Sequence, residues 1–508
     1  MHDKTYDVIV IGGGMAGAHA SWPLVKAGKK VLMLDGGVRP EPSRYHDSDG
    51  DFESLRTESE EQHRLFLGDE LGAVLDASGK SHSSAMTSGN RSYVSEQTQA
   101  HLRLDLEDIH IIQSLAKGGL SEAWGAVCGT FNPRELEHAG MPADRMHAHY
   151  QAVMDRVGIS GSEPGYTTQP PAQITSSMRQ ILARYQKLSS GKRGEFELRP
   201  ALLALLTEPF RNRLPTKYQD LDFYMVKESA IYRARYTIEE LEQHPNFEYQ
   251  PGVVVREVRE NGKHLEVVGT DFTGAHALWD GARVILAAGA INSNRIMLKS
   301  DASFVPTDLM LKPDYTLECF DPRLLGKPGE RARYSLCQLM LDLPGENGES
   351  ALYANFYNYR SLMLWRLLQY APLPTPETLA LLARLSSALV LVDVRFPGSE
   401  GPCEMTLAGD ALVIRQKPQG TAYKKRLPEL KSFLRTLGLI PVRTSPLPLG
   451  ASVHYAGGIA TSLTGEVEKH PGLYVADSSG WKALPAKPTA LTIMANADRI
   501  GTEVLKSL

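Results

Sequence analysis

Residues 5–35, TYDVIVIGGGMAGAHASWPLVKAGKKVLMLD, constrain the fold more strongly than any other part of the chain. The apolar run 8–11 predicts a strand that feeds a glycine-rich turn. A helix is expected to begin near Gly14 and to stop near Gly28, followed by a second strand over 31–34. Strand, turn, helix and strand in this order predict a Rossmann-like βαβ unit at the N-terminus.

The glycines of the turn have the spacing that dinucleotide binding requires. Gly12, Gly14 and Gly17 follow the pattern G-x-G-x-x-G. The first glycine permits the tight turn, the second lets a phosphate approach the backbone, and the third allows close packing of helix on strand. The helix N-terminus would face the pyrophosphate. Asp35 ends the second strand, where an acid can accept hydrogen bonds from the ribose hydroxyls and would repel the 2′-phosphate of NADP.

Length and composition describe an ordinary globular protein. Because the chain has 508 residues, two to four domains are expected. Its net charge of −4, without a basic run, argues against binding to nucleic acid. The four cysteines (Cys128, Cys319, Cys337 and Cys403) show no C-x-x-C spacing and are expected to be free thiols.

Further expectations concern a metal site, a membrane-spanning segment and the cellular location. His147 and His149 form an H-x-H pair without an identifiable third ligand, so no metal site is expected. No uninterrupted run of about 20 apolar residues could span a membrane. The first strand begins too early to leave room for a signal peptide, so the cytoplasm is the expected location. The oligomeric state cannot be read from the sequence.

The chain is expected to leave the dinucleotide domain twice and to return to it twice. Period-two and apolar runs between about 330 and 416 predict one antiparallel sheet, the best candidate for a layer that faces the substrate. Helical spacing is present at 143–157 and 173–188, and strand, glycine and helix recur over 282–299. Segments 1–145 (with a lid or insertion at about 36–100), 246–300 and 446–508 are expected to form the dinucleotide domain. Segments 146–245 and 301–445 are expected to form the substrate domain.

Five segments beyond the N-terminus resemble one family. GGLSEAWG (118–125), VILAAGAINSNRIM (284–297), HYAGG with GLYVADSSGW (454–458 and 472–481) and LTIMANADRI (491–500) together resemble the glucose-methanol-choline (GMC) oxidoreductases. The resemblance covers the whole dinucleotide domain and is weak over 150–250 and 300–440. It implies an α/β fold (α+β overall), with a Rossmann-like FAD-binding domain and a substrate-binding domain built on an antiparallel sheet.

The resemblance also implies the cofactor and the residues that hold it. FAD would lie extended, with its pyrophosphate on the glycine turn and its isoalloxazine beside segment 118–125. Asp477 would precede the last helix, whose N-terminal dipole favours the anionic reduced flavin. The cofactor-binding residues implied in this way are Gly12, Gly14, Met15, Ala16, Gly17, Asp35, Gly118, Gly119, Ser121, Trp124, Gly125, Val254, Ala288, Gly289, Asp477 and Thr492.

His454 is the candidate for proton chemistry. A histidine with a pKa near neutrality can accept the hydroxyl proton of an alcohol while the carbinol hydride passes to flavin N5. The resemblance therefore implies an FAD-dependent oxidoreductase that oxidises a C–OH group of a small molecule, such as a sugar, a polyol or a natural-product intermediate. Oxygen, a quinone or another carrier would then accept the electrons.

The sequence departs from the family where a second histidine or asparagine usually stands. LPAKPTALTIMA places Lys487 or Pro488 there, depending on the alignment. A protonated Lys487 could stabilise an alkoxide, a carboxylate or an enolate. The departure keeps open a flavin-dependent isomerase, lyase or dehydratase that uses Lys487 and His454 without net redox chemistry. A non-catalytic FAD-binding scaffold is a third hypothesis, and a hydrolase is disfavoured because no G-x-S-x-G motif is present.

Overall fold

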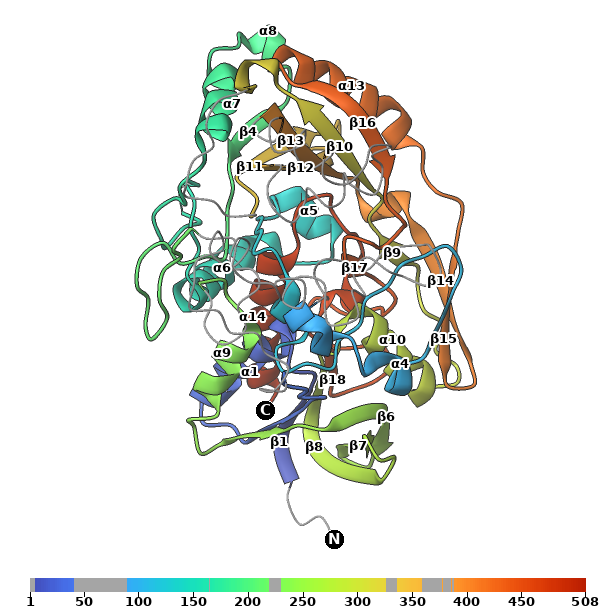
Figure 1. Cartoon of the computed structure of the whole chain (residues 1–508). Helices are drawn as coiled ribbons and strands as arrows, with labels where there is room; N and C mark the ends of the chain where they lie inside the picture. The colour runs from blue at the N-terminus through green and yellow to red at the C-terminus, as the bar shows by residue number, and fades with distance from the viewer. Residues whose placement is uncertain are drawn as a thin grey trace.

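We describe the protein from a computed structural model, in which two lobes lie one above the other (Figure 1). One lobe contains the N-terminal strand, and the other is built on an antiparallel sheet. The structure describes residues 5–40, 89–163, 165–218, 230–325, 336–358 and 388–508, together with 377 and 385. Most of the lid or insertion predicted at about 36–100 lies outside these residues.

The first lobe is a seven-stranded sheet that gathers distant parts of the chain. Its core is parallel, and two further strands continue it as an antiparallel extension beyond β8. In spatial order the strands are β5 (Phe247–Gln250), β2 (Val31–Leu34), β1 (Thr5–Ile11), β8 (His276–Leu286), β7 (His264–Asp271) and β6 (Val253–Asn261), and β18 (Leu473–Val475) also pairs with β8. The early, middle and late parts of the chain therefore share one sheet, as a discontinuous domain requires. The boundaries of the five predicted segments stay a prediction.

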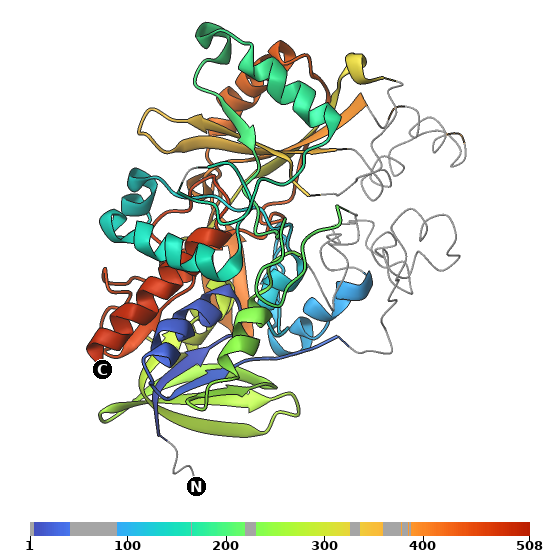
Figure 2. The ribbon, with the colours of Figure 1, turned by 90° about the vertical axis from the view of Figure 1, so that its left-hand side faces the viewer.

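The glycine turn links β1 to helix α1 (Met15–Lys26). Gly12 has a φ of +104°, which a residue with a side chain rarely adopts. A Cβ at Gly17 would lie 1.9 Å from the carbonyl oxygen of Gly12, so helix and strand approach as closely as the sequence predicts. Helix α14 (Ala490–Ser507) packs along α1, and Figure 2 shows these two helices, from opposite ends of the chain, side by side.

The second lobe is a six-stranded sheet with one apolar and one polar face. Its order is β16 (Ile440–Pro446), β10 (Asp314–Phe320), β13 (Leu389–Arg395), β12 (Ser350–Asn358), β11 (Leu339–Pro344) and β4 (Glu197–Pro200). Leu317, Phe356 and Val392 belong to a core that includes helices α7 (Ser176–Gln186) and α13 (Ala422–Thr436). Because strand side chains alternate between faces, Thr316, Asn355 and Asp393 point the other way, toward the interior between the lobes.

A third sheet, of five strands, shows that the prediction of one antiparallel sheet between about 330 and 416 was wrong. The runs between 330 and 416 do not form one sheet, because β14 (Pro402–Ala408) and β15 (Ala411–Gln416) are not part of the sheet of β11, β12 and β13. Segment 309–311 and segment 455–456 pair there instead, and the sequence gives no sign of such distant partners. This sheet contains β17 (Tyr455–Ala456), β9 (Leu309–Leu311), β14 (Pro402–Ala408), β15 (Ala411–Gln416) and β3 (Leu104–Leu106).

Short helices complete the described part of the chain. The predicted helix 143–157 is α6 (Ala143–Val157), and the segment predicted as helix over 173–188 contains α7. The other α-helices are α4 (Thr98–His101), α5 (Pro133–His138), α8 (Ser190–Arg193), α9 (Ala234–Leu241) and α10 (Gly289–Ser300). The 3₁₀ helices are η2 (Gly89–Val94), η3 (Gly119–Ala123), η5 (Pro322–Leu324), η8 (Gly398–Glu400) and η9 (Ser478–Gly480).

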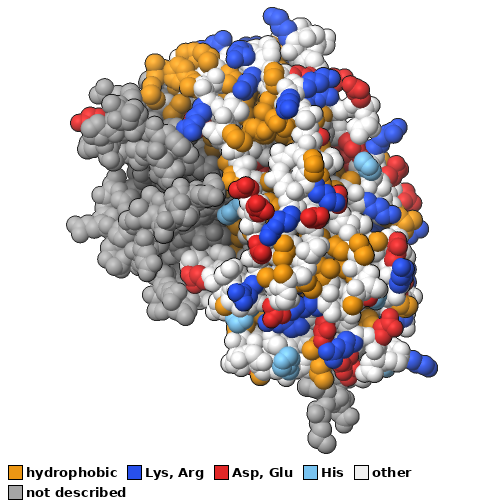
Figure 3. Space-filling view, turned by 90° about the vertical axis from the view of Figure 1, so that its right-hand side faces the viewer, with side chains coloured by type: hydrophobic (Ala, Val, Ile, Leu, Met, Phe, Trp, Pro, Cys, Tyr) orange, Lys and Arg blue, Asp and Glu red, His pale blue; other side chains and the backbone are white. Residues whose placement is uncertain are grey.

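Several general expectations can be compared with these elements. The four cysteines are buried free thiols, as predicted. Among the described residues no helix is long and apolar enough to cross a membrane, and no cluster of side chains is suited to hold a metal ion. Figure 3 shows acidic and basic side chains intermixed over one face of the molecule rather than gathered into a basic patch.

Candidate active site

A cavity of about 660 Å³ lies between the two lobes. Its walls come from the carboxyl ends of β1, β2 and β8 below and from the polar face of the six-stranded sheet above. Clefts of this size, at the point where parallel strands end, are typical small-molecule sites. The predicted site residues that line the cavity are Gly12, Gly14, Met15, Ala16, Asp35, Gly119, Ser121, Trp124, Gly125, Val254, Ala288, Gly289, His454 and Asp477.

The glycine turn leaves space on the cavity side. Gly14 caps the N-terminus of α1 in an extended conformation, with a φ of −79°, and no side chain caps this helix. A Cβ at Gly14 would meet no atom within 4 Å, so the free N–H groups of the first turn face open space. This arrangement fits a pyrophosphate, which would accept those hydrogen bonds and lie at the positive end of the helix dipole.

Asp35 lies where the second strand meets the turn. One carboxylate oxygen accepts a hydrogen bond from the N–H of Gly13 at 2.9 Å, and the other accepts one from the Tyr249 hydroxyl at 2.8 Å. Burial raises the pKa of Asp35, and these hydrogen bonds oppose that rise. Because each carboxylate oxygen has two lone pairs, the side chain keeps acceptor capacity for ribose hydroxyls.

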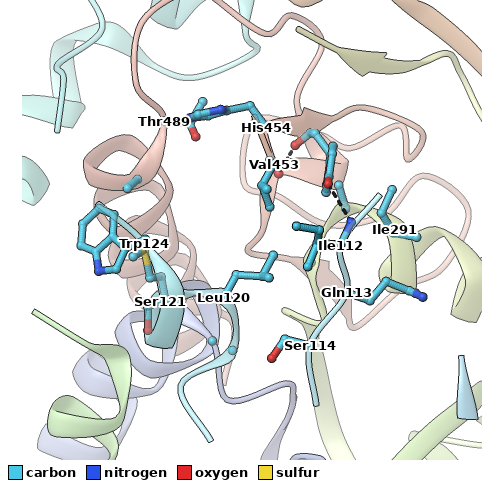
Figure 4. Close-up of a pocket in the computed structure, with 18 of the residues that line it drawn as sticks. Ile112, Gln113, Ser114, Leu120, Ser121, Trp124, Ile291, Val453, His454 and Thr489 are labelled. Carbon is cyan, nitrogen blue, oxygen red and sulfur yellow. Dashed lines mark hydrogen bonds between the residues drawn. The ribbon is translucent and has the colours of Figure 1, made fainter. Parts of the chain in front are cut away.

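Segment 118–125 forms η3 and borders the cavity opposite His454 (Figure 4). Gly119 approaches Gly14 so closely that a Cβ would lie 3.2 Å from its Cα. Ser121 donates to the carbonyl oxygen of Gly118 at 2.6 Å and accepts from the backbone N–H of Ala234. Trp124 donates its indole N–H to the carbonyl oxygen of Tyr232 at 2.7 Å, which fixes the ring beside the cavity.

Asp477 has a different neighbour from the one expected. It precedes α14 in the chain but is separated from it by η9, which it caps through Ser479, and it also reaches the start of α10. Its carboxylate accepts hydrogen bonds from the N–H of Gly289 at 2.8 Å and from the Ser293 hydroxyl at 2.5 Å. It therefore ties two helix N-termini to the cavity wall. The N-terminus of α14 still borders the cavity, through Thr489 and Ala490.

His454 lies at the upper end of the cavity, next to Thr489 (Figure 4). It follows Val453, whose φ of +62° is strained for a β-branched residue, and such strain is concentrated at functional sites. Burial and the positive charges of Lys312 and Arg395 hold the pKa of His454 well below its usual value, against a weak opposing contact with the backbone of Ser452. The imidazole is therefore neutral at pH 7 and can accept a proton.

Lys487 does not reach the cavity. Its ammonium is buried at 3.0 Å from the carboxylate of Glu135 and 3.4 Å from that of Asp342. Glu135 is itself held by the backbone N–H of Asn132, in a capping box at the start of α5. The next residue, Pro488, does line the cavity, so the backbone reaches the site while the lysine side chain points away from it.

This placement predicts a structural role for Lys487. The variant Lys487→Met would leave two buried carboxylates without their cation, which should lower the free energy of unfolding by about 3 kcal/mol. Thermal unfolding measures the loss, and the exposed Lys424→Met on α13 is the matched control. A catalytic lysine would give the opposite result, with activity lost and the melting temperature unchanged.

Three other predicted residues also lie outside the cavity lining. Gly17 supports the packing of α1, and Gly118 precedes η3 with a φ of +98°. The Thr492 hydroxyl is buried and hydrogen-bonded to that of Tyr150 at 2.6 Å. The cofactor contacts predicted for Gly17, Gly118 and Thr492 therefore lack support from the geometry.

The largest group of residues that the prediction missed comes from the six-stranded sheet. Asp314, Thr316, Asn355, Asp393 and Arg395 all line the cavity. A signal was present in the sequence, because polar residues alternate with apolar ones in DYTLECF (314–320) and in VDVR (392–395). Alternation of this kind is also typical of a sheet with one solvent-exposed face, so it could not assign these residues to a site.

Comparisons with known proteins support the cofactor and the fold. A family model described as glucose inhibited division protein A matches residues 7–54. The (S)-6-hydroxynicotine oxidase of Paenarthrobacter nicotinovorans is 45% identical over 53 residues, which are 10% of this chain and 12% of that protein. The chain thus matches only about an eighth of the length of this curated relative.

A solved structure extends the likeness to nearly the whole chain. The crystal structure of pyridoxine 4-oxidase from Mesorbium loti aligns over 98% of this chain and 99% of its own, with a TM-score of 0.61 and 14% sequence identity. The predicted fold class is confirmed, and the dinucleotide unit, the open glycine turn and Asp35 fit FAD as the cofactor. Over nearly its whole length, the chain therefore has the fold of this pyridoxine 4-oxidase.

Proposed function

We propose that the protein is an FAD-dependent oxidoreductase that oxidises a C–OH group of a small molecule, with His454 as the general base. The observation that carries the proposal is the position of a neutral histidine in the cavity that the dinucleotide turn opens into. FAD, when bound, supplies the acceptor for the carbinol hydride. The family resemblance and the names of the two related proteins, both oxidases, support this reaction class.

His454 would take the hydroxyl proton of the substrate. A neutral imidazole within hydrogen-bond reach of an alcohol can accept its proton as the hydride leaves the carbinol carbon. Lys312 and Arg395 oppose a positive charge on the ring, so the imidazolium would return its proton readily once the product leaves. Trp124 and segment 118–125, on the opposite side of the cavity, would hold the flavin ring in place.

The alternative without net redox chemistry loses its main support. It depended on Lys487 as a cationic catalytic group, and the Lys487 ammonium is paired with Glu135 and Asp342 outside the cavity. An isomerase, lyase or dehydratase would then have His454 and no lysine. We therefore favour oxidation, with a small-molecule substrate and oxygen as the first electron acceptor to test.

The test is the absorption spectrum of the purified protein, followed by anaerobic addition of alcohols. We expect a flavin spectrum that bleaches with a substrate alcohol and returns when air is admitted. A quinone dye replaces air as the acceptor if the bleached form persists. Protein that contains no flavin and binds none when FAD is added would contradict the proposal. A substrate turned over without reduction of any acceptor would favour the alternative instead.

A further inference from the structure

Buried polar side chains form a hydrogen-bonded chain behind the part of the cavity wall that Trp124 belongs to (Figure 4). His19 of α1 contacts the Tyr232 hydroxyl through Nε2 at 2.9 Å and the Arg156 guanidinium through Nδ1 at 2.7 Å. Arg156 of α6 donates in turn to the carboxylate of Asp498 of α14 at 2.8 Å. These four side chains are at most 7% exposed. One buried network therefore links helices α1, α6 and α14 to residue 232.

The arginine fixes the direction of the hydrogen bonds in this network. A guanidinium donates and cannot accept, so the Nδ1 atom of His19 must be the acceptor. The ring proton is then on Nε2, which donates to the Tyr232 oxygen. Tyr232 keeps its own proton for the Thr237 hydroxyl, at 2.6 Å. Burial and the nearby charge of Arg156 hold the pKa of His19 well below its usual value, so the ring stays neutral and keeps this tautomer.

Tyr232 also supports the cavity wall through the backbone around it. Its carbonyl oxygen accepts the indole N–H of Trp124 at 2.7 Å. Two residues later, the N–H of Ala234 donates to the Ser121 hydroxyl at 2.9 Å. Trp124 and Ser121 both line the cavity, so the wall is bonded at two points to the same short segment. The tyrosine ring, anchored at its far end by His19, holds that segment in place.

Stability alone does not account for a buried network of this kind. Removing two charges from water is costly, and apolar side chains of similar size are often equally stabilising or more so. Here a guanidinium, a carboxylate and an imidazole are buried among three packed helices. Because hydrogen bonds have defined lengths and directions, a fully paired network fixes one arrangement of its members. The arrangement fixed here is that of residue 232, to which Trp124 is bonded.

Building on the proposed function, we propose that His19 is a positioning residue of the active site, which holds Trp124 through Tyr232 in the geometry that receives the flavin ring. His19 acts one layer behind the cavity, since Tyr232 lies between it and Trp124. A wall that is already held in place does not have to be ordered when FAD binds, and this preorganisation strengthens binding.

The indole of Trp124 can be observed directly by fluorine NMR. In protein that contains 5-fluorotryptophan, each of the five tryptophans gives a resonance, and Trp124→Phe assigns one of them. His19→Leu leaves Arg156 and Tyr232 without their shared partner, so it should shift or broaden the Trp124 resonance of the apoprotein. FAD affinity, measured by flavin fluorescence titration, should fall about tenfold, within the range typical of coupling between two sites of one protein.

Three further variants separate positioning from a general loss of stability. His19→Gln should restore the resonance and the affinity, because its amide oxygen can accept from Arg156 while its amide nitrogen donates to Tyr232. Tyr232→Phe keeps the ring and removes the hydroxyl, so it should disturb the Trp124 resonance even if His19→Leu fails to fold. Leu24→Ala, in the core on the same helix, should lower the melting temperature and leave the resonance and the affinity unchanged.

The outcomes separate this inference from the proposed function. If the Trp124 resonance is the same in His19→Leu, Tyr232→Phe and the unmodified protein, the inference is wrong. An equal change in Leu24→Ala, or no recovery in His19→Gln, would assign the effect to lost packing and would also overturn it. A displaced Trp124 with unchanged FAD affinity would show that this indole does not receive the flavin ring, against the inference. If resonance and affinity change as expected but no alcohol reduces the flavin, the positioning role stands and the proposed oxidation fails.

Discussion

The variant His454→Ala is expected to lose about 10²- to 10⁴-fold in the rate of flavin reduction while FAD stays bound. The loss follows because the neutral imidazole of His454 is the group proposed to take the hydroxyl proton, whereas the dinucleotide turn lies in the opposite lobe. Stopped-flow absorbance under anaerobic conditions measures the rate. The exposed His276→Ala, on β8, is the matched control and should react like the unmodified protein.

The pH dependence gives a second readout for His454. Since burial and nearby positive charges lower the pKa of His454, the base form persists well below pH 6.5. The value of kcat/KM should therefore rise through this low pKa and reach a plateau at neutral pH. Full activity in His454→Ala, with an unchanged pH profile, would contradict a role as general base.

The variant Gly14→Asp is expected to abolish FAD binding without unfolding the protein. Aspartate is a favoured N-cap, and a Cβ at Gly14 meets no protein atom within 4 Å, so α1 should tolerate it. Its carboxylate would nevertheless lie where the pyrophosphate binds. Two like charges about 4 Å apart repel by about 4 kcal/mol at an effective dielectric constant of 20, which corresponds to about 10³-fold in affinity.

Flavin fluorescence titration of the apoprotein measures this affinity, and thermal unfolding of the apoprotein checks the fold. The exposed Gly191→Asp on α8, where a Cβ also meets no atom within 4 Å, is the control for adding an aspartate in open space. Unchanged FAD affinity in Gly14→Asp would show that the dinucleotide lies elsewhere. A fall in the melting temperature of the apoprotein would show that Gly14 supports the fold rather than the cofactor.

The local features of the dinucleotide-binding part of the site could be predicted from the sequence. The spacing of Gly12, Gly14 and Gly17 specifies a turn whose geometry depends on neighbours within a few residues. The strand over 31–34 has the predicted bounds, and Asp35 lies at the turn as expected. In such elements, residues that are close in the sequence are also close in space, so their geometry can be predicted from the sequence.

The upper half of the site shows where such prediction fails. Lys487 stands beside a proline that lines the cavity, yet its side chain turns to Glu135, more than 350 residues earlier in the chain. No local pattern shows which way a side chain points when its partner is that distant. For the same reason, one predicted antiparallel sheet proved to be two, since β9 and β17 add partners from other parts of the chain.

The sequence by itself determined the βαβ unit and the dinucleotide turn, because glycine conformation and hydrophobic periodicity act over short stretches of chain. The candidate base His454 came from the family resemblance of the segment around it. Only the tertiary structure decided which polar side chains meet above the cavity. Asp314 and Arg395 become neighbours through strand register, and both line the cavity. Register and burial depend on how distant strands pack, and packing is a property of the whole fold.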